Sequence, residues 1–119
     1  LFDFGCYGAN LFTWMLDNQR PQRVLCSVKR NKPHIYTNVD DEATILVDYP
    51  GAQGIIQASW NWPFSRKDFE VYSEKAYAHA MGGNLVRRRL SGAKAEDSVV
   101  PGDLPPGQSD ALSHLIAVA

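Results

Sequence analysis

Two side chains near the start of the sequence could handle a proton together, the carboxylate Asp3 and the phenol Tyr7. They are four residues apart, a spacing that on a helix places both on one face, one turn apart. A carboxylate can orient a phenol or a substrate hydroxyl while the phenol exchanges a proton with an oxygen that gains charge. The spacing alone favours a plainer interpretation, in which Asp3 caps the helix and Tyr7 packs in the core.

A second candidate site lies in residues 59–68, SWNWPFSRKD, where aromatic and basic residues follow a predicted strand. Aromatic rings stack on the C–H faces of sugars, and cations bind hydroxyls and carboxylates. Trp62, Arg66 and Lys67 are therefore candidate substrate-binding residues. In the alternative interpretation Trp60 and Trp62 pack in the core or in an interface, and the two cations are solvated.

The sequence gives no comparable signal for a metal or a nucleophile. His34, His79 and His114 lack the short spacings of a metal site, so we expect no metal ligands. Cys6 and Cys26 have neither a CxxC spacing nor a disulfide pattern. We interpret both cysteines as small buried hydrophobes.

The elements that position these residues follow from the hydrophobic pattern. A helix is predicted over 5–16, because Tyr7, Leu11, Trp14 and Met15 form one continuous face, and Asp17-Asn18 and Pro21 end it. Alternating patterns predict strands at 23–30, 42–49, 54–62, 68–75, 76–80 and 84–90, and the second and third of these form a hairpin. Residues 91–107 are expected to be a surface connector, and 108–119 a last helix with Ser109 as N-cap.

This order of elements predicts an α+β fold, an open, mostly antiparallel β-sheet with helices packed on one face. Two helices are too few to cover both faces of such a sheet. The uncovered apolar face is therefore a candidate surface for oligomer formation, unless a further part of the polypeptide covers it.

The bulk composition excludes some classes of partner. The net charge of −1 gives no general case for binding nucleic acid or an anionic membrane, and the basic run at 87–89 is interpreted as a solvated or interface edge. No apolar run is long enough to predict a membrane span. The 119 residues suit one domain and begin and stop inside apparent elements, so we expect a piece of a longer polypeptide. The sequence does not define the compartment; the cytoplasm is favoured over the periplasm.

The segment DFGCYGANLFTWML resembles the start of the C-terminal domain in the glucose–fructose oxidoreductase, inositol dehydrogenase and rhizopine catabolism family (Gfo/Idh/MocA). Many members carry Asp-x-Gly-x-His-x-x-Asp there, and the glucose–fructose oxidoreductase and dihydrodiol dehydrogenase branches have Tyr in place of His. The resemblance continues through VDDEATILVDYPGAQGIIQASW and FEVYSEKAYAHA, and covers about residues 1–90. The matching motif positions here are Asp3, Gly5, Tyr7 and Asn10.

The resemblance implies that the parent chain is an NAD(P)-dependent oxidoreductase acting on a sugar or polyol CH–OH group. Tyr7 then stands at the acid/base position with Asp3 as its neighbouring carboxylate, and Asn10 at a substrate-binding position where many members have a second Asp. The family holds NAD or NADP mainly in an N-terminal Rossmann domain. No Gly-x-Gly-x-x-Gly occurs here, so we assign no cofactor-binding residue to this sequence.

The resemblance also implies that residues 1–119 are a substrate-binding and oligomerisation domain, incomplete at both ends and inactive alone. Its expected partners are the sugar or polyol, the Rossmann domain of its own chain, and further copies through the open sheet face. An alternative is a non-catalytic carbohydrate-binding or dimerisation module of the same fold.

Overall fold

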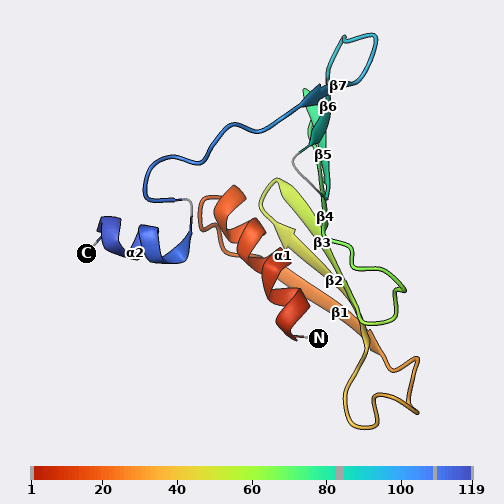
Figure 1. The fold of residues 1–119 in the computed structure, drawn as a ribbon. Coiled ribbons are helices and arrows are strands. Elements are labelled where there is room, and N and C mark those ends of the chain that lie inside the picture. Colours follow the sequence, from red (N-terminus) through yellow and green to blue (C-terminus); the bar gives the residue numbers. More distant parts are fainter. Residues whose placement is uncertain (1, 83–84, 109, 119) are drawn as a thin grey trace. The chain divides into compact units, whose positions relative to one another are not determined.

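The structure is a computed structural model that describes residues 2–82, 85–108 and 110–118, without the side chains of residues 2, 3 and 111. The chain forms two compact units, Leu1–Phe64 and Ser65–Ala119, and each is described here by itself. The described residues form two antiparallel sheets and two helices (Figure 1). The predicted α+β class with open antiparallel pairing is confirmed, although the described strands form two sheets where one was expected.

The first unit is one helix on a three-stranded sheet. Helix α1 (Phe2–Met15) precedes strands β1 (Arg23–Lys29), β2 (Glu42–Tyr49) and β3 (Ala52–Ser59), which pair in the order β1-β2-β3. The predicted hairpin is confirmed, and Gly51 has the positive φ of 81° that its tight turn requires. Strand β3 ends at Ser59, so Trp60 and Trp62 lie beyond the strand that was expected to carry them.

Helix α1 begins earlier than predicted, and its backbone includes Asp3 in the first turn rather than before it. It ends where the sequence indicates. Asp17 and Asn18 have positive φ values of 49° and 60°, which short polar side chains tolerate. The amide of Asn18 donates to the carbonyl of Thr13 at 2.8 Å, so the last turn is closed by a backbone hydrogen bond.

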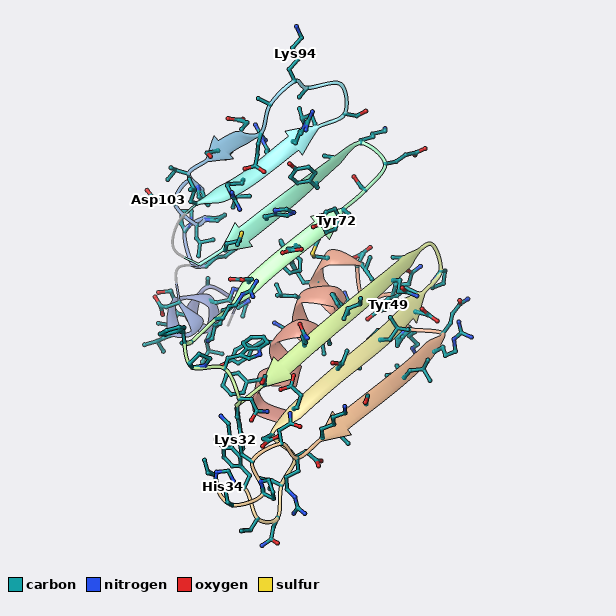
Figure 2. The ribbon with its side chains drawn as sticks, turned by 90° about the vertical axis from the view of Figure 1, so that its right-hand side faces the viewer. Lys32, His34, Tyr49, Tyr72, Lys94 and Asp103 are labelled. Carbon is teal, nitrogen blue, oxygen red and sulfur yellow. The ribbon has the colours of Figure 1, made fainter. Side chains whose placement is uncertain are left out.

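The core of the first unit lies between α1 and one face of β2 and β3; Figure 2 shows the helix behind this sheet. Glycines allow the helix to approach closely. A Cβ at Gly8 would lie 2.8 Å from Ile56, and one at Gly54 would lie 2.3 Å from the ring of Phe12. The buried cluster consists of Val47, Tyr49 and Ile56, with Phe12, Leu16, Ile45 and Ala52 packed against it.

Because α1 contacts β2 and β3, strand β1 stays exposed along its length. Cys26 lies on this strand, and Cys6 lies on the solvent side of α1. Both cysteines are exposed, so the interpretation of them as buried hydrophobes is wrong.

The second unit contains a four-stranded antiparallel meander. Its strands are β4 (Asp68–Tyr72), β5 (Ala76–Met81), β6 (Val86–Leu90) and β7 (Asp97–Val99). The first three were predicted, although the boundaries differ by a few residues. β7 lies inside the segment expected to be a connector, and its three residues are too few for an alternating pattern to show.

Helix α2 (Ala111–Val118) confirms the predicted last helix. The carboxylate of Asp110 accepts hydrogen bonds from the amide of Ser113 at 2.9 Å and from its hydroxyl at 2.7 Å, the pattern of an N-cap. Ser109, the predicted cap, lies outside the described residues. Neither α2 nor any other helix in the described ranges is long and apolar enough to cross a membrane.

Candidate active site

The solvent face of α1 carries two of the predicted site residues. Tyr7 is 52 % exposed and Asn10 is exposed, and Trp14, one turn further on, is 78 % exposed. The alternative in which Tyr7 packs in the core is therefore wrong. The helix turns the side with Gly5, Gly8 and Phe12 to the sheet instead, because Gly8 allows close approach to Ile56 and Gly54 leaves room for the Phe12 ring.

Asp3 lies one helical turn before Tyr7 on the backbone of α1. Its side chain lies outside the described residues, so the pairing of this carboxylate with the Tyr7 phenol stays a prediction. Cys6 and Tyr7 both take part in interactions within the folded chain.

The two tryptophans after β3 have different environments. The ring of Trp60 is half-buried between two other aromatic rings, 6.3 Å from Phe4 in an edge-on arrangement and 5.2 Å from Tyr36. Because Phe4 is in the first turn of α1, Trp60 supports the end of the helix that carries Tyr7. Trp62 is exposed, and it also takes part in an interaction within the folded chain.

Arg66 and Lys67 belong to the second unit, just before β4. The Arg66 guanidinium pairs with the carboxylate of Asp68, and both Arg66 and Lys67 are exposed. Of the predicted site residues, the structure thus brings Tyr7 and Asn10 onto one helix face. It places Trp62 elsewhere in the same unit, and Arg66 and Lys67 in the other unit.

A buried carboxylate that the sequence did not reveal lies near the start of β2. Asp41 is 0 % exposed. Its carboxylate accepts hydrogen bonds from the amides of Asn31 at 2.8 Å and Lys32 at 2.7 Å, and from the Asn61 side chain at 3.2 Å. Burial raises the pKa of Asp41, but these hydrogen bonds outweigh it and hold the pKa below its ordinary value. The sequence signal was a carboxylate directly before a buried strand.

One face of the second unit's sheet carries an aromatic cluster. Tyr72 and Tyr77 are paired across β4 and β5, and the His79 ring stacks on Tyr77 with ring centroids 4.8 Å apart. The Tyr72 hydroxyl donates to Glu70 at 2.9 Å and lies 3.0 Å from Nε2 of His79. The hydrogen bond to Glu70 and partial burial raise the pKa of Tyr72, so this phenol stays protonated at neutral pH.

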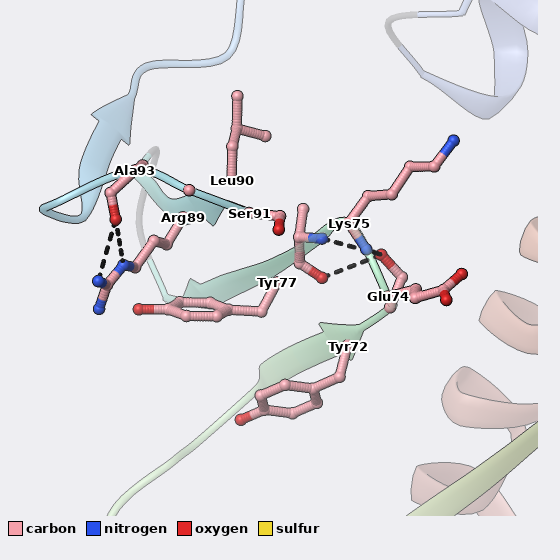
Figure 3. A pocket seen from close by; sticks show the side chains of 11 residues that line it. Tyr72, Glu74, Lys75, Tyr77, Arg89, Leu90, Ser91 and Ala93 are labelled. Atoms are coloured by element: carbon pink, nitrogen blue, oxygen red, sulfur yellow. Dashed lines mark hydrogen bonds between the residues drawn. The ribbon is translucent and has the colours of Figure 1, made fainter.

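A shallow pocket of about 330 Å³ lies beside this cluster, at the β4–β5 turn and the end of β6 (Figure 3). Its walls include Tyr72, Tyr77 and Arg89. The Arg89 guanidinium is occupied by the backbone, since its Nε and an Nη donate to the carbonyl of Ala93 at 3.1 and 3.0 Å. None of the predicted site residues lines this pocket, so it adds no support to the predicted site.

The first unit is thus a helix packed on an antiparallel sheet, with Tyr7 exposed on the helix. The family described as GFO/IDH/MocA C-terminal domain matches residues 1–79, and the chain belongs to this family. A search of curated protein sequences found no match.

A solved structure has a similar fold: an inositol dehydrogenase homolog from Azotobacter vinelandii, complexed with NADH and myo-inositol. The two are 21 % identical, with a TM-score of 0.70 over 82 % of this chain. The present chain spans 27 % of that protein's length. This likeness establishes the fold of the domain.

Proposed function

We propose that this chain is the substrate-binding and oligomerisation domain of an NAD(P)-dependent oxidoreductase that acts on a sugar or polyol CH–OH group. The observation that carries the proposal is the position of Tyr7, exposed on the face of α1 that turns away from the sheet. Tyr7 also matches the acid/base position of the family motif. The myo-inositol and NADH bound by the Azotobacter homolog support a polyol substrate and a nicotinamide cofactor.

In this proposal the solvent face of α1 is the wall of the site that handles the proton. Tyr7 takes the proton of the substrate hydroxyl when the neighbouring carbon is oxidised, and returns it in the reverse reaction. Asp3, one turn earlier, orients the phenol or the substrate hydroxyl. Asn10, three residues after Tyr7 on the same helix, binds a second hydroxyl of the substrate. Trp62 stacks on a C–H face of the substrate, and Arg66 and Lys67 bind further polar groups.

The described residues do not form a dinucleotide site of their own. Every strand pair in the described ranges is antiparallel, whereas a dinucleotide fold needs parallel strands with a glycine-rich turn into a helix. NAD or NADP would therefore bind mainly to the N-terminal domain of the parent chain. The large exposed side chains of α1, Tyr7 and Trp14, are suited to face that domain and the substrate held between.

The sheet face opposite α1 is proposed to bind a second copy of the protein. Leu25, Leu46 and Ile55 are aligned across β1, β2 and β3 and form an apolar row on this face. Ile55 is 66 % exposed, and Leu25 is also exposed. Exposed apolar residues on an open sheet face are typical of an oligomer interface.

Replacing Tyr7 by Phe in the full-length parent protein tests the proposed reaction. With myo-inositol or glucose as substrate and NAD or NADP as acceptor, Tyr7→Phe should lower kcat about 10²-fold or more and change KM by less than about twofold, because only the proton-handling hydroxyl is lost. Tyr72→Phe is the matched control, since it removes another exposed phenol hydroxyl outside the proposed site. It should leave kcat unchanged.

Two results would contradict the proposal. One is a Tyr7→Phe variant that keeps the full rate. The other is a parent protein that binds these polyols without oxidising them in the presence of either nucleotide, which would favour the non-catalytic binding module.

A further inference from the structure

In the described part of the chain, every hydrogen bond to the buried Asp41 carboxylate comes from an N–H group. Its two oxygens divide the donors: Oδ1 accepts from the Asn31 amide and Oδ2 from the Lys32 amide, at 2.8 and 2.7 Å. A buried charge is tolerated only when such hydrogen bonds replace its lost hydration. Because every one of these hydrogen bonds comes from an N–H donor, the arrangement favours the ionised form of the carboxylate.

The backbone of Asp41 connects two further segments. Its amide donates to the carbonyl of Lys29 at the end of β1, at 3.1 Å. Its carbonyl accepts from the amide of Trp60 at 2.9 Å and from the Asn61 side chain at 3.1 Å. One residue therefore joins the end of β1, the loop that follows it, and the segment that follows β3.

A second set of hydrogen bonds fixes Asn61. Its side-chain amide also donates to Glu42 at 3.0 Å, and its backbone amide donates to the Ser59 hydroxyl at 3.0 Å. The Lys32 ammonium donates to the backbone carbonyl of Asn61 at 3.2 Å. The conformation of Asn61, the residue that follows Trp60, is thus fixed by several hydrogen bonds, of which those of its side chain go to Asp41 and Glu42.

The ring of Trp60, whose backbone amide donates to Asp41, lies against the start of α1. Trp60 packs on Phe4, which precedes Tyr7 by three residues on the same helix, and on Tyr36 from the β1–β2 loop. Trp60 therefore links the hydrogen-bonded network to the first turn of the helix. A change in the Asp41 bonds would move Trp60, and with it the end of α1 that carries Tyr7.

We propose that Asp41 is a positioning residue of the active site, acting through Trp60 and Phe4 on the first turn of α1. This inference rests on the proposed function, because the geometry that Asp41 sets is that of the Tyr7 phenol. Asp41 touches neither substrate nor cofactor in this proposal. A misplacement of the phenol by about 1 Å is enough to lower the rate of proton transfer strongly.

The test compares Asp41→Asn with Asp40→Asn in the full-length parent protein. Asp40 is the matched control, because it is the adjacent carboxylate and it is exposed. In Asp41→Asn the new NH₂ group faces an N–H donor, so one hydrogen bond is lost and two donors oppose each other. Asn61→Ala is the second variant; it keeps the carboxylate and removes the hydrogen bonds of the Asn61 side chain to Asp41 and Glu42, while the backbone bond from Trp60 to Asp41 stays.

Two readouts are needed. In Asp41→Asn, backbone hydrogen exchange at Asn31, Lys32 and Trp60 and in the first turn of α1 should become about tenfold faster or more. With myo-inositol, kcat should fall about tenfold or more while KM changes less than about twofold. Asn61→Ala should change exchange at Trp60 and α1 in the same direction, and Asp40→Asn should change neither readout.

Unchanged exchange in α1 in both Asp41→Asn and Asn61→Ala would overturn the inference. Faster exchange with an unchanged kcat would also overturn it, since Asp41 would then serve stability alone. If the wild-type parent oxidises none of the polyols tested, the proposed function fails, and exchange in the first turn of α1 still decides whether Asp41 positions that turn.

Discussion

The ring of Phe12 in α1 lies directly against Gly54 of β3, so close that a Cβ on the glycine would fall 2.3 Å from a ring carbon. Gly54→Ala should therefore push the helix away from the sheet and destabilise the fold by about 1–3 kcal/mol, the usual cost of overpacking a core. Gly102→Ala is the control, since no atom lies within 4 Å of the position of its Cβ. It should change the free energy of unfolding by about 0.5 kcal/mol or less. Denaturant unfolding of both variants measures this difference, and equal stabilities would contradict the close contact.

The first unit should lose stability in acid. Hydrogen bonds hold the pKa of Asp41 below its ordinary value despite burial, and those from Gln53 and Arg23 lower the pKa of Asp48. A lowered pKa in the folded state means that the stabilisation is complete above the unfolded-state pKa, 3.8 for both groups, and is lost as pH falls below it.

Thermal unfolding followed between about pH 7 and about pH 2.5 measures this loss. The midpoint should fall in wild type mainly below the pKa of unfolded aspartate. The Asp41→Asn variant should start from a lower midpoint and fall less steeply there, because it has no carboxylate at that position to protonate. A parallel fall in both proteins would show that Asp41 is not responsible.

The apolar row opposite α1 predicts an oligomer of the parent protein. Ile55→Lys would place a charge in this row, where an interface would strip it of water, so the assembly should dissociate into smaller species. Gln57→Lys is the matched control: it is exposed on the same face of β3 but outside the row. Mass measurement by light scattering after gel filtration distinguishes the variants, and an unchanged mass for Ile55→Lys would exclude this face as the interface.

The β2–β3 hairpin and the end of α1 could be predicted because each depends on residues that are adjacent in the sequence. Strands β2 and β3 alternate in polarity around Pro50 and Gly51, and the end of α1 is set by Asp17 and Asn18, two residues that tolerate the left-handed conformation. These features depend on neighbours in the sequence. The family motif likewise named Tyr7 from a few adjacent positions.

The rotation of α1 could not be predicted in the same way. Hydrophobicity alone favours burying the face of Tyr7 and Trp14, whereas the structure buries Gly5, Gly8 and Phe12. How closely two backbones can approach decides the contact, and that depends on Ile56 and Gly54, which are distant in sequence. The Asp41 network was missed for the same reason, since its bonds join residues 31, 41 and 61.

Asp41 also has a consequence for how the chain folds. A shift of β2 by one residue against its neighbours would turn every side chain to the other side and carry the carboxylate away from the N–H groups that stabilise it. Such a misaligned sheet would lack the hydrogen bonds that the Asp41 carboxylate accepts from Asn31, Lys32 and Asn61, and would be less stable for that reason. The same aspartate therefore favours the native alignment of β2 over one shifted by a residue.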